Sequence, residues 1–198
     1  MKKVCVVTGG GSGIGFAAAK EAAKKGYYVM IVGRNEKKLA GAVEKLRKDG
    51  CEAEAHSCDV SDREHCFALA RHAAECGAVK AVLHIARMSP HMGDAEKIMQ
   101  ANALGTVNIN DAFFEVIAEG GYVIDTSSTS AYMAPSFIMP KRVYPLACTD
   151  RKLFMDKMMK KVKMFPRKTR EGVAYSMSIR TGIRVGNEDL KDISIFII

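Results

Sequence analysis

Short hydrophobic runs alternate with longer segments of helical periodicity across the first 127 residues. The short runs are bounded by turn residues and predict buried strands. The predicted strands are Val4–Thr8, Tyr28–Val32, Cys51–His56, Val79–Ile85 and Tyr122–Thr126. The predicted helices are Ile14–Lys25, Glu36–Asp49, Asp62–Cys76 and Ala95–Ile117. Strands that alternate with helices in this way predict a parallel sheet with helices on both faces.

The regular alternation stops after residue 127. Residues 128–150 contain three prolines and predict an irregular loop. Residues 151–165 predict an amphipathic helix, because apolar side chains recur on one face and lysines occupy the rest. The last stretch, Ile193–Ile198, is typical of one more strand.

Composition limits the class of protein. The chain has 198 residues, of which 48% are hydrophobic, so we expect one domain with a sizeable core. The N-terminal apolar run is too short for a signal peptide or a membrane span. Six cysteines without a C-x-x-C pair are typical of reduced thiols in the cytoplasm. His65, His72 and Cys58 are close in sequence, but their spacing is wider than in known metal sites, so we expect no metal.

The positive charge is concentrated in one segment. Residues 141–170 carry eleven basic and two acidic side chains, so their net charge of +9 exceeds the +8 of the whole chain. A nucleic-acid-binding protein also needs aromatic or groove-reading elements, and we expect no nucleic-acid partner. A basic interaction module built on this segment is one hypothesis for function.

The sequence TGGGSGIG, Thr8 to Gly15, directly follows the first predicted strand and opens the first predicted helix. Glycine lets a backbone turn tightly and approach a pyrophosphate, while the helix N-terminus supplies N–H groups and the positive end of its dipole. The strand–turn–helix context makes this motif more specific than a glycine-rich string alone. We therefore predict a dinucleotide-binding site at this turn.

The spacing Gly9-x-x-x-Gly13-x-Gly15 resembles the motif of the short-chain dehydrogenase/reductase family. The resemblance is dense over residues 3–127 and returns at residues 172–178. It implies an α/β fold with a Rossmann-like, doubly wound parallel sheet, incomplete here at its C-terminal end. The cofactor-binding positions that it implies are Thr8, Gly9, Gly11, Ser12, Gly13, Ile14, Gly15, Arg34, Asp59, Val60 and Ala86.

Two of these positions bear on the cofactor. Gly33 stands at the position where NAD-preferring members of the family that the sequence resembles carry an acidic residue. Arg34, the next residue, suits the 2′-phosphate of NADP. Asp59 matches the family's acidic residue near the adenine, although a role at the start of the next helix is the alternative. Ser61 and Glu64 have the spacing of a capping box for that helix.

The segment LHIARMSP, Leu83 to Pro90, stands where the family carries Asn-Asn-Ala-Gly, and only Ala86 agrees. His84 is expected to bond to backbone at the end of its strand; a catalytic base is the alternative. Arg87 replaces a glycine, which would cost about 1 kcal/mol if the position required a positive φ.

The resemblance implies hydride transfer between the cofactor and an alcohol or carbonyl. Ser128, with Ser127 as the second choice, matches the residue that orients the substrate oxygen. Tyr175 in AYSMS matches the proton donor, and Asn102 matches an asparagine that supports a water and a lysine. That lysine normally lies one helical turn after the tyrosine, lowers its pKa and holds the nicotinamide ribose. Ile179 occupies this position and can do neither.

The C-terminal third departs from the family in two further ways. Residues 128–171 form an insertion that we interpret as a lid or substrate pocket, with a basic face suited to an acidic substrate such as a CoA thioester; a solvated charged helix is the alternative. Residues 179–198 match poorly, which is compatible with an internal deletion or a frameshift. Gly182–Asn187 faintly resembles the family's next strand.

Two main functions remain open. The first is an NADP-dependent short-chain oxidoreductase that interconverts a secondary alcohol and a carbonyl in the cytoplasm. The second is a non-catalytic relative that binds NADP(H). The resemblance also implies pairing of two copies through the helices that carry Asn102 and Tyr175, although the helix after Tyr175 is expected to be short. No membrane partner is expected.

Overall fold

The contacts between residues divide the chain into two units. The first comprises residues 1–86 and 108–125, and the second comprises residues 87–107 and 126–198. The computed structural model describes residues 1–133, 139–188 and 193–197. Each unit is described by itself.

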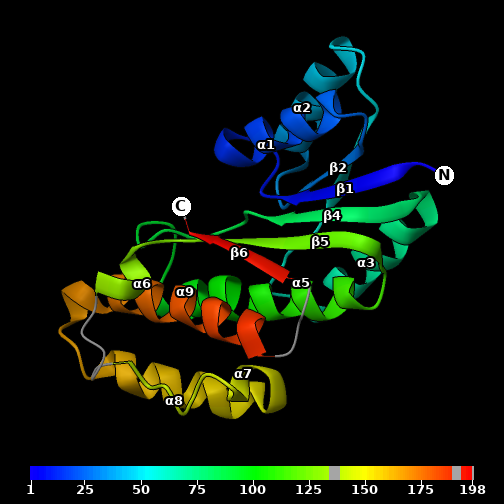
Figure 1. The fold of residues 1–198 in the computed structure, drawn as a ribbon. Coiled ribbons are helices and arrows are strands. Elements are labelled where there is room, and N and C mark those ends of the chain that lie inside the picture. The colour runs from blue at the N-terminus through cyan, green and yellow to red at the C-terminus, as the bar shows by residue number, and fades with distance from the viewer. Residues whose placement is uncertain (134–138, 189–192, 198) are drawn as a thin grey trace. The chain divides into compact units, whose positions relative to one another are not determined.

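The first unit contains a parallel sheet with helices packed against it (Figure 1). Its strands are β1 (Lys3–Thr8), β2 (Tyr28–Gly33), β3 (Ala53–Ser57), β4 (Ala78–His84) and most of β5 (Ile117–Ser127). Its helices are α1 (Gly13–Lys24), α2 (Glu36–Lys48), α3 (Arg63–Cys76) and residues 108–114 of α5 (Gly105–Phe114). The strands pair in parallel in the order β3-β2-β1-β4-β5. This is the Rossmann-like arrangement that the sequence predicts.

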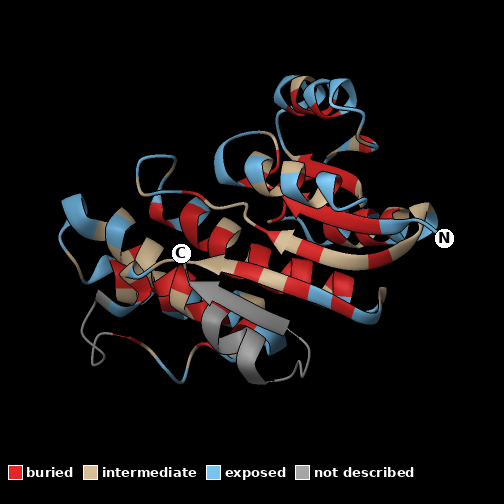
Figure 2. Ribbon diagram, turned by 45° about the horizontal axis from the view of Figure 1, so that its top comes forward, coloured by how far each residue is buried: buried red, intermediate tan, exposed pale blue. Residues whose placement is uncertain are grey.

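The central strands β1 and β2 of this unit are buried on both faces (Figure 2). Cys5 and Val7 of β1 pack in one cluster with side chains of α1 and α2. Their neighbours Val4 and Val6 point to the opposite face because successive side chains alternate along a strand, and they are equally buried. Burial on both faces explains why the strands are near-continuous apolar runs.

Most predicted boundaries agree with the structure within two residues. The exceptions are the start of β5, at Ile117 rather than Tyr122, and the end of the helix predicted for Ala95–Ile117. The predicted helix Ala95–Ile117 is divided into α4 (Ala95–Met99), a π-helical turn η1 (Gln100–Leu104) and α5, and it ends at Phe114 because β5 begins at Ile117. The predicted capping box at Ser61 is wrong. Asp62 caps α3 by accepting the His65 N–H at 3.1 Å, because Ser61 is hydrogen-bonded to Asp59 instead.

The second unit is mostly helical. Beside α4, η1 and the first turn of α5, it contains α6 (Ser130–Met133), α7 (Leu146–Thr149), α8 (Arg151–Lys163), a 3₁₀ turn η2 (Arg167–Thr169), α9 (Arg170–Glu188) and β6 (Ile193–Ile197). The predicted strand at the end of the chain is thus confirmed. Residues 182–187 continue α9, so their interpretation as a strand is wrong, and the helix that carries Tyr175 is 19 residues long rather than short.

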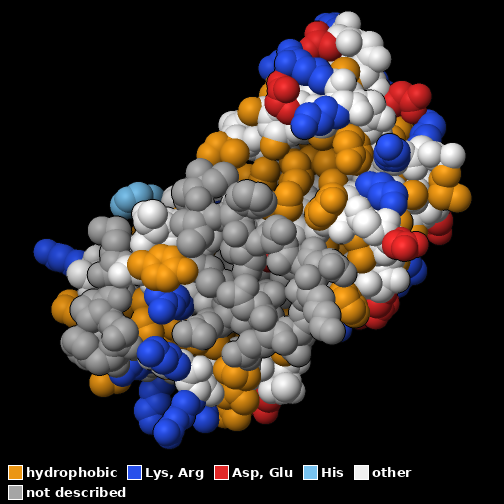
Figure 3. Space-filling model, viewed as in Figure 1, with side chains coloured by type: hydrophobic (Ala, Val, Ile, Leu, Met, Phe, Trp, Pro, Cys, Tyr) orange, Lys and Arg blue, Asp and Glu red, His pale blue; other side chains and the backbone are white. Residues whose placement is uncertain are grey.

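Helix α8 is the amphipathic helix predicted for residues 151–165. Phe154, Met158 and Val162 are fully buried in the core of the second unit, together with Met99 of α4 and Met177 of α9. The lysines of α8 lie on its other faces, and Figure 3 shows Lys and Arg side chains gathered over this helix. The inserted segment is therefore part of the core of its unit.

The irregular loop predicted for residues 128–150 contains the two short helices α6 and α7, and residues 134–138 lie outside the described residues. Among the helices of the described part of the chain, none combines the length and apolar character needed to cross a membrane.

Candidate functional site

The glycine-rich turn joins β1 to α1 in the first unit. Gly9 has a φ of +70° and Gly13 a φ of +54°, a left-handed conformation that favours glycine over other residues. The Gly9 N–H donates to the Val32 carbonyl at 2.8 Å, which ties the start of the turn to β2. The shape of the turn therefore depends on glycine at these two positions and on a backbone hydrogen bond to β2.

The contacts that an added Cβ would make divide the glycines of the turn into two groups. A Cβ on Gly15 would lie 2.2 Å from the Gly9 carbonyl oxygen, and one on Gly10 would lie 2.2 Å from the Ile31 side chain. These two glycines let the turn pack closely. A Cβ on Gly13 would meet nothing within 4 Å, and one on Gly11 would make only ordinary contact at 3.4 Å. Gly13 thus leaves open space beside the turn, whereas a side chain at Gly11 would contact α2.

The start of α1 has the features of an anion-binding site. Ser12 is the N-cap of this 12-residue helix, and its side chain makes no capping hydrogen bond. The N–H groups of the first turn are therefore left uncapped by Ser12, at the positive end of the helix dipole. Ile14 is 61% exposed in this turn. The open space and the uncapped N–H groups fit the pyrophosphate of a dinucleotide.

Thr8 and His84 join the ends of β1 and β4. The Thr8 hydroxyl oxygen accepts the N–H groups of Ile85 at 3.0 Å and Ala86 at 3.1 Å, and lies 2.8 Å from His84 Nδ1. Two accepted bonds use both lone pairs, so the Thr8 proton is donated to His84 Nδ1, and a neutral His84 carries its proton on Nε2. The contact of His84 at Nδ1 is thus a side chain, and its expected bond to backbone stays a prediction.

The Thr8 hydroxyl also fixes the backbone of Ile85 and Ala86, in the segment where the family that the sequence resembles carries asparagines. Ala86 is held by its N–H next to Gly9, whose added Cβ would lie only 3.0 Å from the Ala86 nitrogen. Arg87 belongs to the second unit, and its Nη2 donates to the Thr126 carbonyl at 2.7 Å. Every described residue with a positive φ is a glycine, so Arg87 has no left-handed strain.

Arg34 and Asp59 follow the ends of β2 and β3. The Arg34 side chain is 57% exposed, and its Nη1 lies 3.9 Å from Asp59 Oδ2. Asp59 accepts two hydrogen bonds from Ser61, from its backbone N–H at 3.0 Å and its hydroxyl at 2.7 Å. Burial raises the pKa of Asp59, but these bonds and the Arg34 charge outweigh it, so the pKa is lowered. Asp59 is therefore ionised at neutral pH, and Arg34 is an exposed cation beside it.

Val60 is buried, and its carbonyl accepts the Asn108 Nδ2–H at 2.9 Å. This bond links the loop after β3 to α5 and fixes the backbone that follows Asp59. All the predicted cofactor-binding residues thus lie in the first unit, in the β1–α1 turn or in the segments that follow β2, β3 and β4.

The predicted catalytic residues all belong to the second unit. Asn102 lies in the π-helical turn and is fully buried. Its side chain accepts the Met88 N–H at 2.8 Å and donates to the Met88 carbonyl at 2.9 Å, and its backbone carbonyl accepts the Thr106 hydroxyl at 2.8 Å. Isolated π-helical turns inside α-helices are frequent at functional sites. Asn102 thus holds the segment after β4.

Ser128 follows β5, and its hydroxyl accepts the Ser130 N–H at 3.3 Å. Its neighbours have buried hydroxyls: neither Ser127 Oγ nor Ser130 Oγ has a hydrogen-bond partner among the described residues. A buried hydroxyl without a partner is rare in a folded protein. Sequence reasoning missed Ser130, whose unpaired state only the structure reveals.

Tyr175 lies on α9, half-buried against the core of the second unit. One turn later, Ile179 is 3% exposed, so an apolar side chain fills that position. Arg180, the next residue along the helix, has other partners. Its Nη1 donates to the Ala131 carbonyl at 3.0 Å, and its guanidinium lies 4.7 Å from the centre of the Tyr132 ring. Arg180 is therefore bound to α6.

Helix α9 connects the three candidates, since it packs against α4, the π-helical turn and α6. These contacts bring the element that carries Asn102, and the segment directly after Ser128, to the helix that carries Tyr175.

A pocket of about 950 Å³ opens in the second unit. The segment after β4 lines one side of it, from Pro90 to Asp94. The inserted segment adds Met139, Phe165, Lys168 and Thr169, and α9 adds Ser176 and Met177, which directly follow Tyr175. Sequence reasoning placed an insertion here, but it did not identify the residues of the pocket, because they come from three separate segments.

Comparison with known proteins agrees with this fold. The family model for short chain dehydrogenase matches residues 3–140. Sorbose reductase sou1 of Schizosaccharomyces pombe is 32% identical over 146 residues, which cover 67% of this chain and 57% of the relative. The chain spans about half the length of the curated relatives it matches.

Two solved structures show the same fold. An actinorhodin polyketide ketoreductase with NADPH has a TM-score of 0.69 and 20% identity, and the match covers 99% of this chain and 69% of that one. An NAD⁺-bound xylitol dehydrogenase has a TM-score of 0.68 and 20% identity, covering 93% of this chain and 62% of that one. Together with the matched family model and the geometry of the β1–α1 turn, these findings lead to one conclusion: the chain belongs to the short-chain dehydrogenase family of oxidoreductases.

Proposed function

We propose that the protein is an NADP(H)-dependent oxidoreductase that interconverts a secondary alcohol and a carbonyl. The observation that carries the proposal is the β1–α1 turn, whose two left-handed glycines, open outer side and uncapped helix start fit a pyrophosphate. The bound cofactor supplies or accepts the hydride. Six free thiols agree with a reducing compartment, and we assign the activity to the cytoplasm.

The preference for NADP follows from Arg34. Its side chain is exposed, follows the end of β2, and keeps a 3.9 Å distance to the ionised Asp59, which is too long for a direct hydrogen bond. The guanidinium thus retains donors for a 2′-phosphate. No carboxylate stands at Gly33 to repel that phosphate.

In the second unit we assign proton transfer to Tyr175 and orientation of the substrate oxygen to Ser128. The Tyr175 hydroxyl donates its proton to the oxygen of the carbonyl as it is reduced, and takes it back in the reverse direction. The Ser128 hydroxyl, or that of Ser127, donates a hydrogen bond to the same oxygen. Asn102 positions these groups by fixing the segment that begins at Met88.

The rate should be low, because nothing in the described surroundings of Tyr175 replaces the missing ammonium. Ile179 is apolar and Arg180 is bound to α6. A hydroxyl that donates its proton is left with a negative charge, and a cation beside it would stabilise that charge.

The substrate is a small molecule, and the pocket beside α9 is the proposed place for the part of it that does not react. Its lining combines Lys168 with Asp94 and Glu171, so its charge alone does not select an acidic group. We also propose that two copies pair through the helices that carry Asn102 and Tyr175.

Cofactor titration tests the proposal first. NADPH should bind more tightly than NADH, and Arg34→Ala should weaken NADPH binding by about 1.5–3 kcal/mol, or about 10- to 150-fold, while NADH binding stays unchanged. Arg71→Ala is the matched control, because Arg71 is exposed on α3. Equal affinities for both cofactors in the unaltered protein would contradict the preference.

Turnover is measured next, as NADPH oxidation with a panel of ketones. Slow reduction that Tyr175→Phe abolishes would support the assignment of the proton donor. Tight NADPH binding with no turnover on any ketone would instead assign the non-catalytic alternative.

A further inference from the structure

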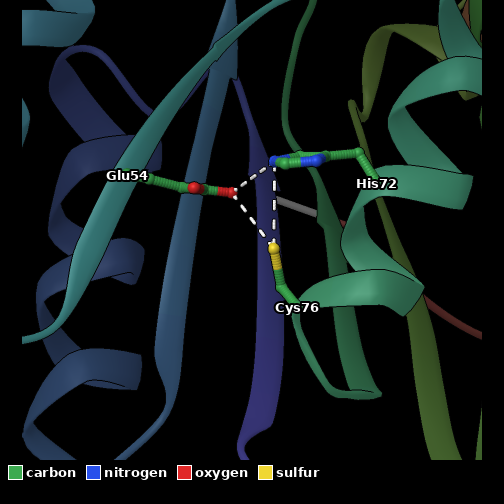
Figure 4. A group of neighbouring side chains, drawn as sticks. All are labelled: Glu54, His72 and Cys76. Atoms are coloured by element: carbon green, nitrogen blue, oxygen red, sulfur yellow. Dashed lines mark hydrogen bonds and ion pairs between the residues drawn. The ribbon is translucent and has the colours of Figure 1, made fainter.

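Three side chains that can bind metals meet on the surface of the first unit, away from the predicted cofactor turn. Glu54 comes from β3, and His72 and Cys76 come from the last turns of α3 (Figure 4). His72 Nε2 lies 2.9 Å from Glu54 Oε1, and Cys76 Sγ lies 3.6 Å from the same oxygen and 3.8 Å from His72 Nε2. The carboxylate, imidazole and thiol thus form a small triangle.

The size of the triangle fits a tetrahedral metal. Zinc binds nitrogen and oxygen at about 2.0–2.1 Å and sulfur at about 2.3 Å, so a tetrahedral ion needs donor separations of about 3.3–3.6 Å. The observed separations of 2.9, 3.6 and 3.8 Å are each within about 0.4 Å of these values. A cation therefore requires only a small outward shift of the Glu54 and His72 side chains.

Surrounding groups hold the ligands in orientations that suit a metal. His72 Nδ1 faces the Glu75 carboxylate at 3.9 Å, which leaves Nε2 pointing at the cluster. A metal-bound histidine usually donates its second ring N–H to a carboxylate, and Glu75 is the carboxylate on that side of the ring, still beyond hydrogen-bond distance. Burial, together with a hydrogen bond from its hydroxyl to Glu54, raises the pKa of Tyr28 to about 12, so this tyrosine remains a donor to the carboxylate. The His56 ring stacks on the His72 ring at 5.2 Å.

We propose that Glu54, His72 and Cys76 bind one zinc ion, with solvent as the fourth ligand. A donor set of nitrogen, sulfur and oxygen selects zinc over magnesium or calcium, which prefer oxygen ligands alone. His72 is 41% exposed and Glu54 is 23% exposed, so the ion has access from solvent. The two positive charges of a zinc ion would balance the negative charges of one carboxylate and one thiolate.

Binding would release one proton. A free thiol has a pKa of about 8.5 and is mostly protonated at neutral pH, whereas a metal ligand must be a thiolate. Zinc binds the thiolate, and the sulfur proton passes to solvent. The positive charge of Lys2 acts on Cys76, and it would repel a cation bound there.

The position of the cluster indicates a structural role. Glu54 is near the start of β3, which is the first strand in the sheet order, and the cofactor turn follows the opposite end of the parallel strand β1. The ion would therefore cross-link the edge strand to α3 without entering the proposed reaction. This inference does not depend on the proposed function.

The test is metal binding by the full chain, prepared metal-free with reduced thiols. Zinc should bind one-to-one in competition with a chromogenic chelator and release about one proton. Cobalt(II) should give a thiolate charge-transfer band and the strong visible bands of a four-coordinate ion. Zinc at a hundredfold excess over its dissociation constant should raise the melting temperature by about 5–10 °C.

Three conservative variants locate the site. Cys76→Ser should abolish the cobalt charge-transfer band, and Cys76→Ser, His72→Gln and Glu54→Gln should each weaken zinc binding at least about tenfold. The matched controls are His65→Gln, about two helical turns before His72 on α3, and Cys148→Ser, an exposed thiol in the second unit; both should bind zinc like the unaltered protein.

Several results would overturn the proposal. These are no one-to-one zinc binding by the unaltered chain, a charge-transfer band that survives Cys76→Ser, or binding lost equally in the two controls. Any of them would leave the cluster as a hydrogen-bonded contact between β3 and α3. The cobalt spectrum of the unaltered protein decides the matter even if a variant fails to fold.

Discussion

Ile179→Lys should raise the rate of the proposed ketone reduction and lower the stability of the folded protein. The introduced ammonium would lie one helical turn after Tyr175, at the i+4 spacing that brings two side chains to one face of a helix. General acid–base assistance is typically worth about 10²–10⁴ in rate, and an ammonium beside Tyr175 should restore part of it by lowering the pKa of the tyrosine. We expect ketone reduction to rise at least about tenfold, with the pH optimum moved toward neutral.

The loss of stability follows from the burial of Ile179, which is 3% exposed. The variant loses apolar burial worth about 1.5–3 kcal/mol. Desolvation also lowers the pKa of the new lysine, at 1.36 kcal/mol for each unit, which adds at least about another 1.5 kcal/mol. A total near 3 kcal/mol or more corresponds to a melting temperature lower by at least about 6 °C.

The pH dependence of this loss has a definite sign. A buried lysine has a lower pKa folded than unfolded, so the unfolded state binds more protons between the two values. The stability of the variant relative to the unaltered protein should therefore recover as the pH rises toward about 10.4, the pKa of an unfolded lysine. Thermal melts at a series of pH values measure this directly.

Two variants separate charge from packing. Ile179→Met conserves the apolar character and volume, so it should cost less than about 1.5 kcal/mol and give no gain in rate. Tyr175→Phe, added to the lysine variant, should abolish the gain. The reasoning is refuted if the lysine variant folds, binds NADPH and reduces no ketone faster than the unaltered protein, because Tyr175 would then not be the proton donor.

Two further predictions concern the glycine turn and the inserted helix. Gly15→Ala should lower the free energy of unfolding by about 1–3 kcal/mol in a chemical melt, because its Cβ would meet the Gly9 carbonyl at 2.2 Å, whereas Gly11→Ala should leave stability unchanged and weaken NADPH binding in a titration. The opposite ranking of the two variants would contradict the packing of the turn. Phe154→Ala should cost about 3–5 kcal/mol, because the ring is fully buried, and Lys157→Ala should cost almost nothing in the same thermal melt. An unchanged melting temperature for Phe154→Ala would mean that α8 is not held in the core.

The interpretation of the insertion as a lid remains a prediction. The packing of α8 gives the opening of such a lid a high cost in free energy. Lifting the helix would expose Phe154, Met158 and Val162, each fully buried and worth about 1.5–3 kcal/mol of apolar burial. The sequence showed lysines and an amphipathic spacing, which a docked helix and a lid share. Only the tertiary contacts with α4 and α9 reveal what the apolar face touches.

The first unit could be predicted from sequence because its signals are local. Buried parallel strands are continuous apolar runs, and the turn after β1 needs glycine for its φ values. The capping of α3 could not be predicted reliably, since Ser61 and Asp62 are both good caps and their choice depends on the bond from Ser61 to Asp59.

The candidate sites depend more on contacts between distant residues. Glu54 is 18 residues from His72, so no spacing rule joins them, although the His72–Cys76 pair at i, i+4 was a signal that a search could have used. The extension of α9 over residues 182–187 was also missed, because the resemblance favoured a strand there and local helix propensity was not weighed against it.

The glycine turn shows how packing and ligand binding can be told apart within one motif. Gly10 and Gly15 are required by close contacts inside the first unit, and Gly9 and Gly13 by their left-handed φ, so a protein that had lost its cofactor would still need all four. Gly11 has neither constraint, since an added Cβ would make only ordinary contact with Leu39 at 3.4 Å. The fold alone therefore does not require glycine there, and the turn is where we propose that the pyrophosphate binds. Gly11 is therefore the position of the turn at which glycine serves the proposed cofactor rather than the fold.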